Sequence, residues 1–89
     1  MKRMIELDAD KLKESSTAYI YLEGLFQFPE ICHNLDALND CLSEVSDECM
    51  IILTKESVEK ICAAPYAYKI LMVFGRASED NPNLHILFR

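Results

Sequence analysis

Two aspartates, Asp36 and Asp40, have the type and spacing in this chain that most directly suggest a binding function. They lie four positions apart within the segment Asn34–Leu42, which places both on nearly the same side of a helix. Two like charges at this spacing destabilise an isolated helix by about 0.2–0.5 kcal/mol, and no lysine or arginine lies within helical reach. Carboxylates kept at such a cost indicate a binding surface. On spacing alone, two surface aspartates without a role remain the simpler interpretation.

The chain has four cysteines without the Cys-x-x-Cys spacing that is typical of structural zinc sites: Cys32, Cys41, Cys49 and Cys62. Cys32, His33 and Cys41 offer three possible ligands, but metal sites normally show tighter spacing. A Cys–His nucleophile in a small thiol-dependent enzyme is a further alternative, which neighbouring carboxylates disfavour because they oppose thiolate formation. We therefore expect no metal, no cofactor and no enzymatic activity. The cysteines are predicted to be reduced and buried, with Cys41 on the core face of its helix.

The charge is distributed unevenly along the chain. The 15 acidic and 9 basic residues give a formal net charge of −6. The interval 14–54 contains eight of the acidic residues and neither lysine nor arginine. This sign is opposite to the basic stripe of a nucleic-acid binder. The interval is either a solvated acidic surface or a patch that steers a positively charged partner.

The 89 residues allow a single domain, residues 1–89, and the hydrophobic fraction of 51% is too high for a disordered acidic tail. No apolar run approaches the roughly 18 residues of a membrane span. The first residues become acidic at Glu6 and Asp8, before an apolar signal-peptide stretch begins. These observations predict a cytoplasmic protein.

Hydrophobic periodicity and turn residues predict three strands and four helices. The first half of the chain has a strand at 3–7, a turn or loop at 8–10, a helix at 16–27 and a helix capped by Asn34. A strand at 50–53, buried on both faces, follows, and then a helix capped by Thr54 or Ser57 that ends near Ala64. The chain continues with a helix that has Pro65 in its first turn, a turn at 81–83 and a strand at 84–88. Strands separated by helices favour a parallel sheet with right-handed crossovers, here with the helices on one side.

The helix after Pro65 has Tyr68, Leu71, Met72 and Phe74 at helical spacing. Tyr66 and Tyr68 are interpreted as helix-packing residues and not as a platform for stacking bases. His85, in the middle of the last strand, is interpreted as a structural residue.

The segment Phe28-Pro29-Glu30, followed by Asn34–Leu42, resembles the signature of the barstar family, intracellular inhibitors of barnase-like ribonucleases. Chain length, element order and the ending from Val73 through the strand at 84–87 extend the resemblance to the whole chain. It implies an α/β fold, a barstar-like two-layer domain in which helices pack on a three-stranded parallel sheet. It also implies that the second helix and the loop before it occlude a ribonuclease active site.

The resemblance also implies which residues contact the partner. Asp40 matches the family's dominant inhibitory aspartate, and Asp36 matches the second. Four further residues match contact positions of the family: Asn34, Leu35, Ser43 and Glu44. We also expect contacts from Ile31 and His33 in the preceding loop and from Asn39 on the polar face of the helix, with an exposed loop histidine without a role as the alternative for His33.

A carboxylate accepts paired hydrogen bonds from arginine much as a phosphate does, so an acidic helix can imitate the RNA backbone. The expected partner is therefore a basic barnase-like ribonuclease, with no direct binding of nucleic acid or membrane and a monomer in isolation. The alternative is a barstar-like immunity or binding module for a different basic toxin or effector protein.

The chain departs from the family pattern at three places. The loop 30–33 lacks the usual tyrosines and glycine and is one residue shorter, Asn39 replaces an aromatic residue, and Arg76 replaces an acidic one. Because aromatic anchors carry much of an interface's binding energy, we expect either a cognate partner that differs in detail or a weaker inhibitor.

Overall fold

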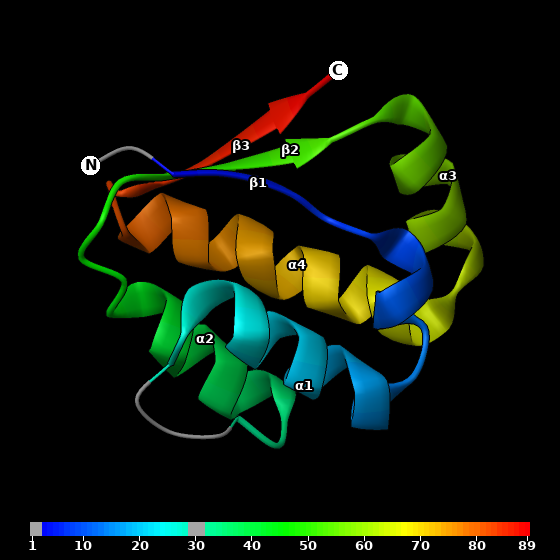
Figure 1. Ribbon diagram of the computed structural model, residues 1–89, viewed down its shortest axis with the longest axis horizontal. Helices are drawn as coiled ribbons and strands as arrows, with labels where there is room; N and C mark the ends of the chain where they lie inside the picture. Colours follow the sequence, from blue (N-terminus) through cyan, green and yellow to red (C-terminus); the bar gives the residue numbers. More distant parts are fainter. Residues whose placement is uncertain (1–2, 29–31) are drawn as a thin grey trace.

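The computed structural model describes residues 3–28 and 32–89 of the chain. Its strands and helices follow the predicted β-α-α-β-α-α-β order, with one additional turn of 3-10 helix (Figure 1). The elements are β1 (Arg3–Glu6), η1 (Ala9–Leu12), α1 (Ser15–Phe26), α2 (Leu35–Ser43), β2 (Cys49–Leu53), α3 (Lys55–Ala63), α4 (Pro65–Asp80) and β3 (Leu84–Phe88).

The three strands form one parallel sheet in the order β1-β2-β3, as the sequence predicts. Ile51 in the central strand pairs with Ile5 on one side and with Ile86 on the other. Both connections step across the sheet in the same direction, so right-handed crossovers place both helix pairs on the same face. Figure 1 shows α1, α2 and α4 beneath the sheet, with α3 beyond the carboxyl end of β2.

The central strand β2 is almost completely buried, and only Met50 is partly accessible. The predicted burial of this strand on both faces is therefore largely confirmed. On the helix-free face, neighbouring strands cover Ile52, since Glu6 and Leu87 flank it in the register. The sheet thus provides a rigid layer against which the helices pack.

The ends of the elements follow local capping chemistry. Asp8 accepts a hydrogen bond from the amide of Asp10 at 3.1 Å, and this contact begins η1 where the sequence predicts a turn or loop. Helix α1 ends because Gln27 adopts a left-handed conformation with φ of 54°. Thr54, the first of the two predicted caps, accepts from the amide of Ser57 at 3.1 Å and begins α3.

Helix α4 buries a different stripe from the predicted one. Its fully buried residues are Ala67, Ile70, Phe74 and Ala77. The expectation was wrong for Tyr68 and Met72, which are 47% and 58% exposed. The two small alanines allow α4 to approach the sheet and α2 closely, and the larger Tyr68 and Met72 turn outward. No helix in the described ranges is long and apolar enough to span a membrane.

Candidate functional site

The start of α2 is fixed by a side-chain cap. The Oδ1 atom of Asn34 accepts a hydrogen bond from the amide of Ala37 at 2.8 Å, as the sequence predicts. Leu35 is the first helical residue and is half-buried, so it anchors the first turn. Asp36 therefore lies in that first turn, where the positive end of the helix dipole stabilises a carboxylate.

Asp36 and Asp40 are both exposed on α2, whose opposite face is closed by the fully buried Leu38 and Leu42. Within residues 3–28 and 32–89, neither carboxylate forms an ion pair with a lysine, arginine or histidine of the chain. The core side of the helix fixes its orientation, and the two carboxylates keep their capacity to accept hydrogen bonds from an external cation.

The carboxyl end of α2 is also held in place. The Oγ atom of Ser43 donates to the carbonyl oxygen of Asp40 at 2.7 Å, and Glu44 ends the helix as an exposed residue. The buried Asn81 donates through Nδ2 to the carbonyl oxygens of Leu42 at 2.9 Å and Val45 at 3.0 Å. Both ends of the acidic helix therefore have defined hydrogen-bond partners.

A groove of about 300 Å³ runs between α2 and α4 beside Asp36. The exposed side chains of Tyr68 and Met72 line its α4 side together with Lys69 and Arg76. Sequence reasoning missed Tyr68, Lys69 and Met72 as members of this surface. The signal for this in the sequence was too weak to use, because Ala67 and Ala77, at helical spacing from Ile70 and Phe74, contribute little hydrophobic contrast. The groove thus combines the Asp36 carboxylate on α2, two cationic side chains on α4 and several apolar side chains.

Asn39 lies in this groove and is half-buried. Its Oδ1 atom is buried and has no hydrogen-bond partner among the described residues. An unsatisfied buried acceptor costs about 1–3 kcal/mol relative to a satisfied one. The family resemblance places an aromatic side chain at this position.

The predicted contact residues before α2 are only partly described. Ile31 lies outside the described residues. His33 is exposed, whereas Cys32 is 3% exposed and packs into the core. Asn34 and His33 thus share an accessible surface at the amino end of α2 with Asp36.

The prediction that all four cysteines are buried holds for Cys32 and Cys49 only. Cys41 is half-buried and Cys62 is exposed on α3, because Cys62 faces away from the sheet while its neighbour Ile61 fills the core. Burial raises the pKa of the Cys49 thiol. In the described part of the chain, no three side chains of the metal-binding types gather into a possible site.

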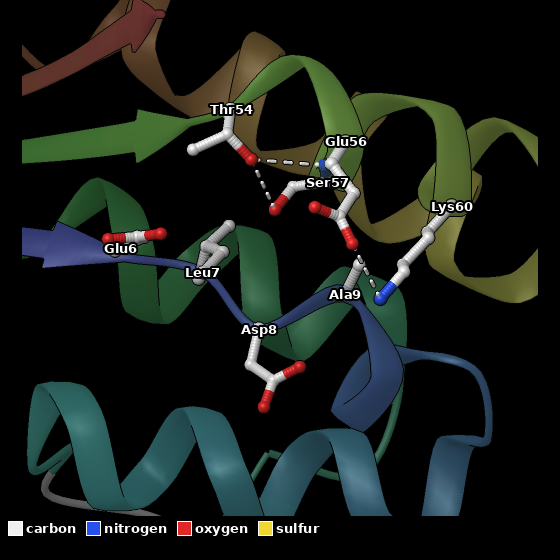
Figure 2. A pocket seen from close by; sticks show the side chains of 8 residues that line it. All are labelled: Glu6, Leu7, Asp8, Ala9, Thr54, Glu56, Ser57 and Lys60. Carbon is white, nitrogen blue, oxygen red and sulfur yellow. Dashed lines mark hydrogen bonds and ion pairs between the residues drawn. The ribbon is translucent and has the colours of Figure 1, made fainter.

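A second hollow, of about 440 Å³, lies at the carboxyl ends of β1 and β2, where parallel sheets often bind ligands (Figure 2). Lys60 lies 3.3 Å from Asp10 and 3.4 Å from Glu56, and the hydrogen bond with Asp10 is the largest cause that raises the pKa of Lys60. Thr54 pairs with Ser57 and Lys60 pairs with Glu56, and these contacts stabilise the start of α3. This hollow is lined by Glu6, Leu7, Asp8, Ala9, Thr54, Glu56, Ser57 and Lys60.

Comparison with known proteins gives one informative result. A family model described as Barstar (barnase inhibitor) matches residues 2–89, nearly the whole chain. No curated protein matches the chain.

Proposed function

The chain belongs to the Barstar (barnase inhibitor) family, and from this membership we propose that it inhibits a basic barnase-like ribonuclease by covering the active site with α2. The family consists of inhibitors, so the expected action is occlusion by binding, without chemical conversion. We propose that the chain acts as a monomeric single domain in the cytoplasm, where an active ribonuclease would reach cellular RNA.

One observation carries this proposal. Asp36 and Asp40 project from one helix, both are exposed, and neither has a cationic partner among the described residues. They lie within the interval 14–54, which has no lysine or arginine. Two such carboxylates on a helix held at both ends suit a partner that presents arginine or lysine.

The active site of a ribonuclease provides such a surface, because it gathers cationic side chains to bind phosphate and stabilise developing charge. Arginine donates two parallel hydrogen bonds to a carboxylate as it does to a phosphate. Carboxylates on a preorganised helix therefore compete for the groups that hold RNA. The negative charge of the interval 14–54 also accelerates encounter with a basic enzyme, and added salt weakens this effect.

The direct test is titration of the purified chain into a barnase-like ribonuclease with a fluorogenic RNA substrate at low ionic strength. We expect ribonuclease activity to fall in proportion to added chain until it reaches a stoichiometric end point. Raising the salt concentration should slow association, measured by stopped-flow fluorescence. If stoichiometric amounts leave the enzyme fully active at low salt, the proposal fails for that ribonuclease.

A second candidate function is binding to a different basic toxin or effector, and the α4 side of the groove favours it. Arg76 and Lys69 face the same groove as Asp36. A partner that fits this groove needs cationic groups against α2 and an acidic or neutral surface against α4. A purely cationic partner is repelled by Arg76.

The variant Arg76→Glu separates the two candidates. If a barnase-like enzyme is the partner, the substitution removes repulsion and should strengthen inhibition. A cognate partner with an acidic residue opposite α4 should instead bind Arg76→Glu more weakly than the natural chain. Lys55→Glu, the same charge change at the exposed start of α3, is the matched control and should leave specific binding of either partner nearly unchanged.

A further inference from the structure

The thiol of Cys32, in the segment just before α2, is in contact with the thiol of Cys41, within α2. The Sγ atoms of Cys32 and Cys41 are 2.7 Å apart, and the Cys32 thiol also lies 3.7 Å from the carbonyl oxygen of Ala37. Both residues are thiols in the structure. This sulfur–sulfur distance is much shorter than the separations at which metal ligands are normally placed across an ion.

The geometry points to a reversible disulfide between Cys32 and Cys41, a modification site that ties the segment before α2 to the body of the helix. A disulfide requires an S–S distance of about 2.05 Å. The two sulfur atoms, at 2.7 Å, need only a small displacement to reach that distance. The bond would close a loop over residues 32–41.

The two sulfur atoms differ in accessibility, and this difference sets the order of reaction. Cys32 is 3% exposed. Cys41 is half-buried and lines a hollow of about 320 Å³ beside Phe28 and Glu44. A small disulfide from solution can therefore reach Cys41 first, and Cys32 lies in contact with the sulfur that it must attack.

The reaction is thiol–disulfide exchange with a small external disulfide as the oxidant. The Cys41 sulfur, after loss of its proton, attacks one sulfur of the reagent, breaks its S–S bond and releases one reagent thiol. The Cys32 sulfur then attacks the Cys41 sulfur and releases the second reagent thiol. Two electrons and two protons pass from the protein to the reagent, which is reduced to two thiols. Excess small thiol reverses both steps.

The test uses the variant Cys62→Ala, because the exposed Cys62 would react with the same reagent. The variant is treated with 2-hydroxyethyl disulfide, a neutral reagent that the acidic surface does not repel. Remaining thiols are alkylated, and the digested protein is mapped by mass spectrometry. We expect the peptides that contain Cys32 and Cys41 to be joined by a disulfide. Cys49, which is buried in β2, should be the thiol that is alkylated once the protein is unfolded.

Two further variants in the Cys62→Ala background make the result specific. With Cys32→Ser, Cys41 should keep half of the reagent as a mixed disulfide, since no second thiol resolves it. With Cys41→Ser, Cys32 should remain a thiol. Two results in the Cys62→Ala variant would overturn the proposal. One is alkylation of both Cys32 and Cys41, and the other is a stable mixed disulfide between Cys41 and the reagent.

Thermal unfolding provides a second readout. Closing a loop over residues 32–41 restricts the unfolded chain, and for a domain of this size the melting temperature should rise by on the order of 10 °C. The rise should disappear when the small thiol is added back. A melting temperature that stays equal or falls on cross-linking would contradict the inference that the bond fits the native geometry.

The consequence for binding rests on the proposed function. The cross-link fixes the segment beside Asn34 before a partner arrives, so less ordering is needed on binding. We expect the oxidised chain to dissociate from a barnase-like ribonuclease about 2- to 10-fold more slowly than the reduced chain. If the cross-link forms but neither form inhibits, the proposed function fails and the disulfide stands. If only the reduced form inhibits, this consequence is wrong.

Discussion

The side-chain amide of Asn81 donates to the carbonyl oxygen of Leu42 at 2.9 Å, across 39 positions of sequence. It joins the turn before β3 to the last turn of α2. The same Nδ2 atom donates to Val45 at 3.0 Å, and Asn81 is only 4% exposed. A single buried side chain thus binds one carbonyl oxygen in the last turn of α2 and a second one just beyond the helix.

Asn81→Ala should lower the free energy of unfolding by about 1–3 kcal/mol, because it leaves the carbonyl oxygen of Leu42 buried without this donor. Urea denaturation followed by circular dichroism measures the change. Asn83→Ala is the control, since Asn83 reaches Val45 only at 3.3 Å and is more accessible. Equal losses for the two variants would mean that the Asn81 contacts have no special role.

Asp40→Ala should weaken inhibition most, by about 3–5 kcal/mol or two to four orders of magnitude in Kd, because a desolvated cation of the partner loses its counter-charge. Asp36→Ala should have a smaller effect. Glu23→Ala, on α1 within the same acidic interval, is the control and should affect only the rate of association. Titration calorimetry and stopped-flow kinetics give both quantities. Equal effects for the three variants would indicate diffuse charge instead of a specific contact.

Asn39→Leu should stabilise the fold by about 1 kcal/mol, because it removes the buried Oδ1 atom that has no partner within the described residues. The substitution keeps the side chain's size and lets it pack against the apolar part of the groove. Differential scanning calorimetry measures the rise in melting temperature. A fall instead of a rise would show that the Asn39 oxygen is satisfied in solution by an ordered water.

Stability should fall above about pH 10, the pKa of tyrosine in an unfolded chain. Burial and a hydrogen bond to Tyr66 raise the pKa of Tyr19 above that value, so the folded state keeps its proton where the unfolded state loses it. The stabilisation is complete below pH 10 and is lost as the pH rises. Tyr19→Phe should make the alkaline decline shallower, measured by urea unfolding at several pH values. Tyr21, whose pKa burial also raises, should leave a residual slope.

The element order was predictable because strong local signals agree with the fold. Asn34 and Thr54 cap helices, Pro65 occupies the first turn of α4, and the apolar residues of β2 require burial on both faces. The exposure of Asp36 and Asp40 also followed from the sequence, since Leu38 and Leu42 define the opposite face. Their role in binding stays a prediction.

The groove beside them was not predictable, since its α4 wall depends on which stripe α4 buries. Ala67 and Ala77 are buried because they allow close approach, and alanine has little hydrophobic signal against Tyr68 or Met72. The sequence grouped Cys32 with Cys41 only as possible metal ligands and did not predict the direct contact between their thiols. This contact depends on the path by which the chain returns to α2, and not on any regular spacing.

The sheet order has a consequence for biosynthesis. Each strand pairs with the next only after two helices have been made, and the buried donor that completes the acidic helix comes from residue 81. Chains emerge from the ribosome amino end first, and such distant pairings form late. An unfinished chain therefore carries the carboxylates without the scaffold that holds them. If the chain acts as proposed, inhibition of a ribonuclease would begin only when translation has passed the last strand.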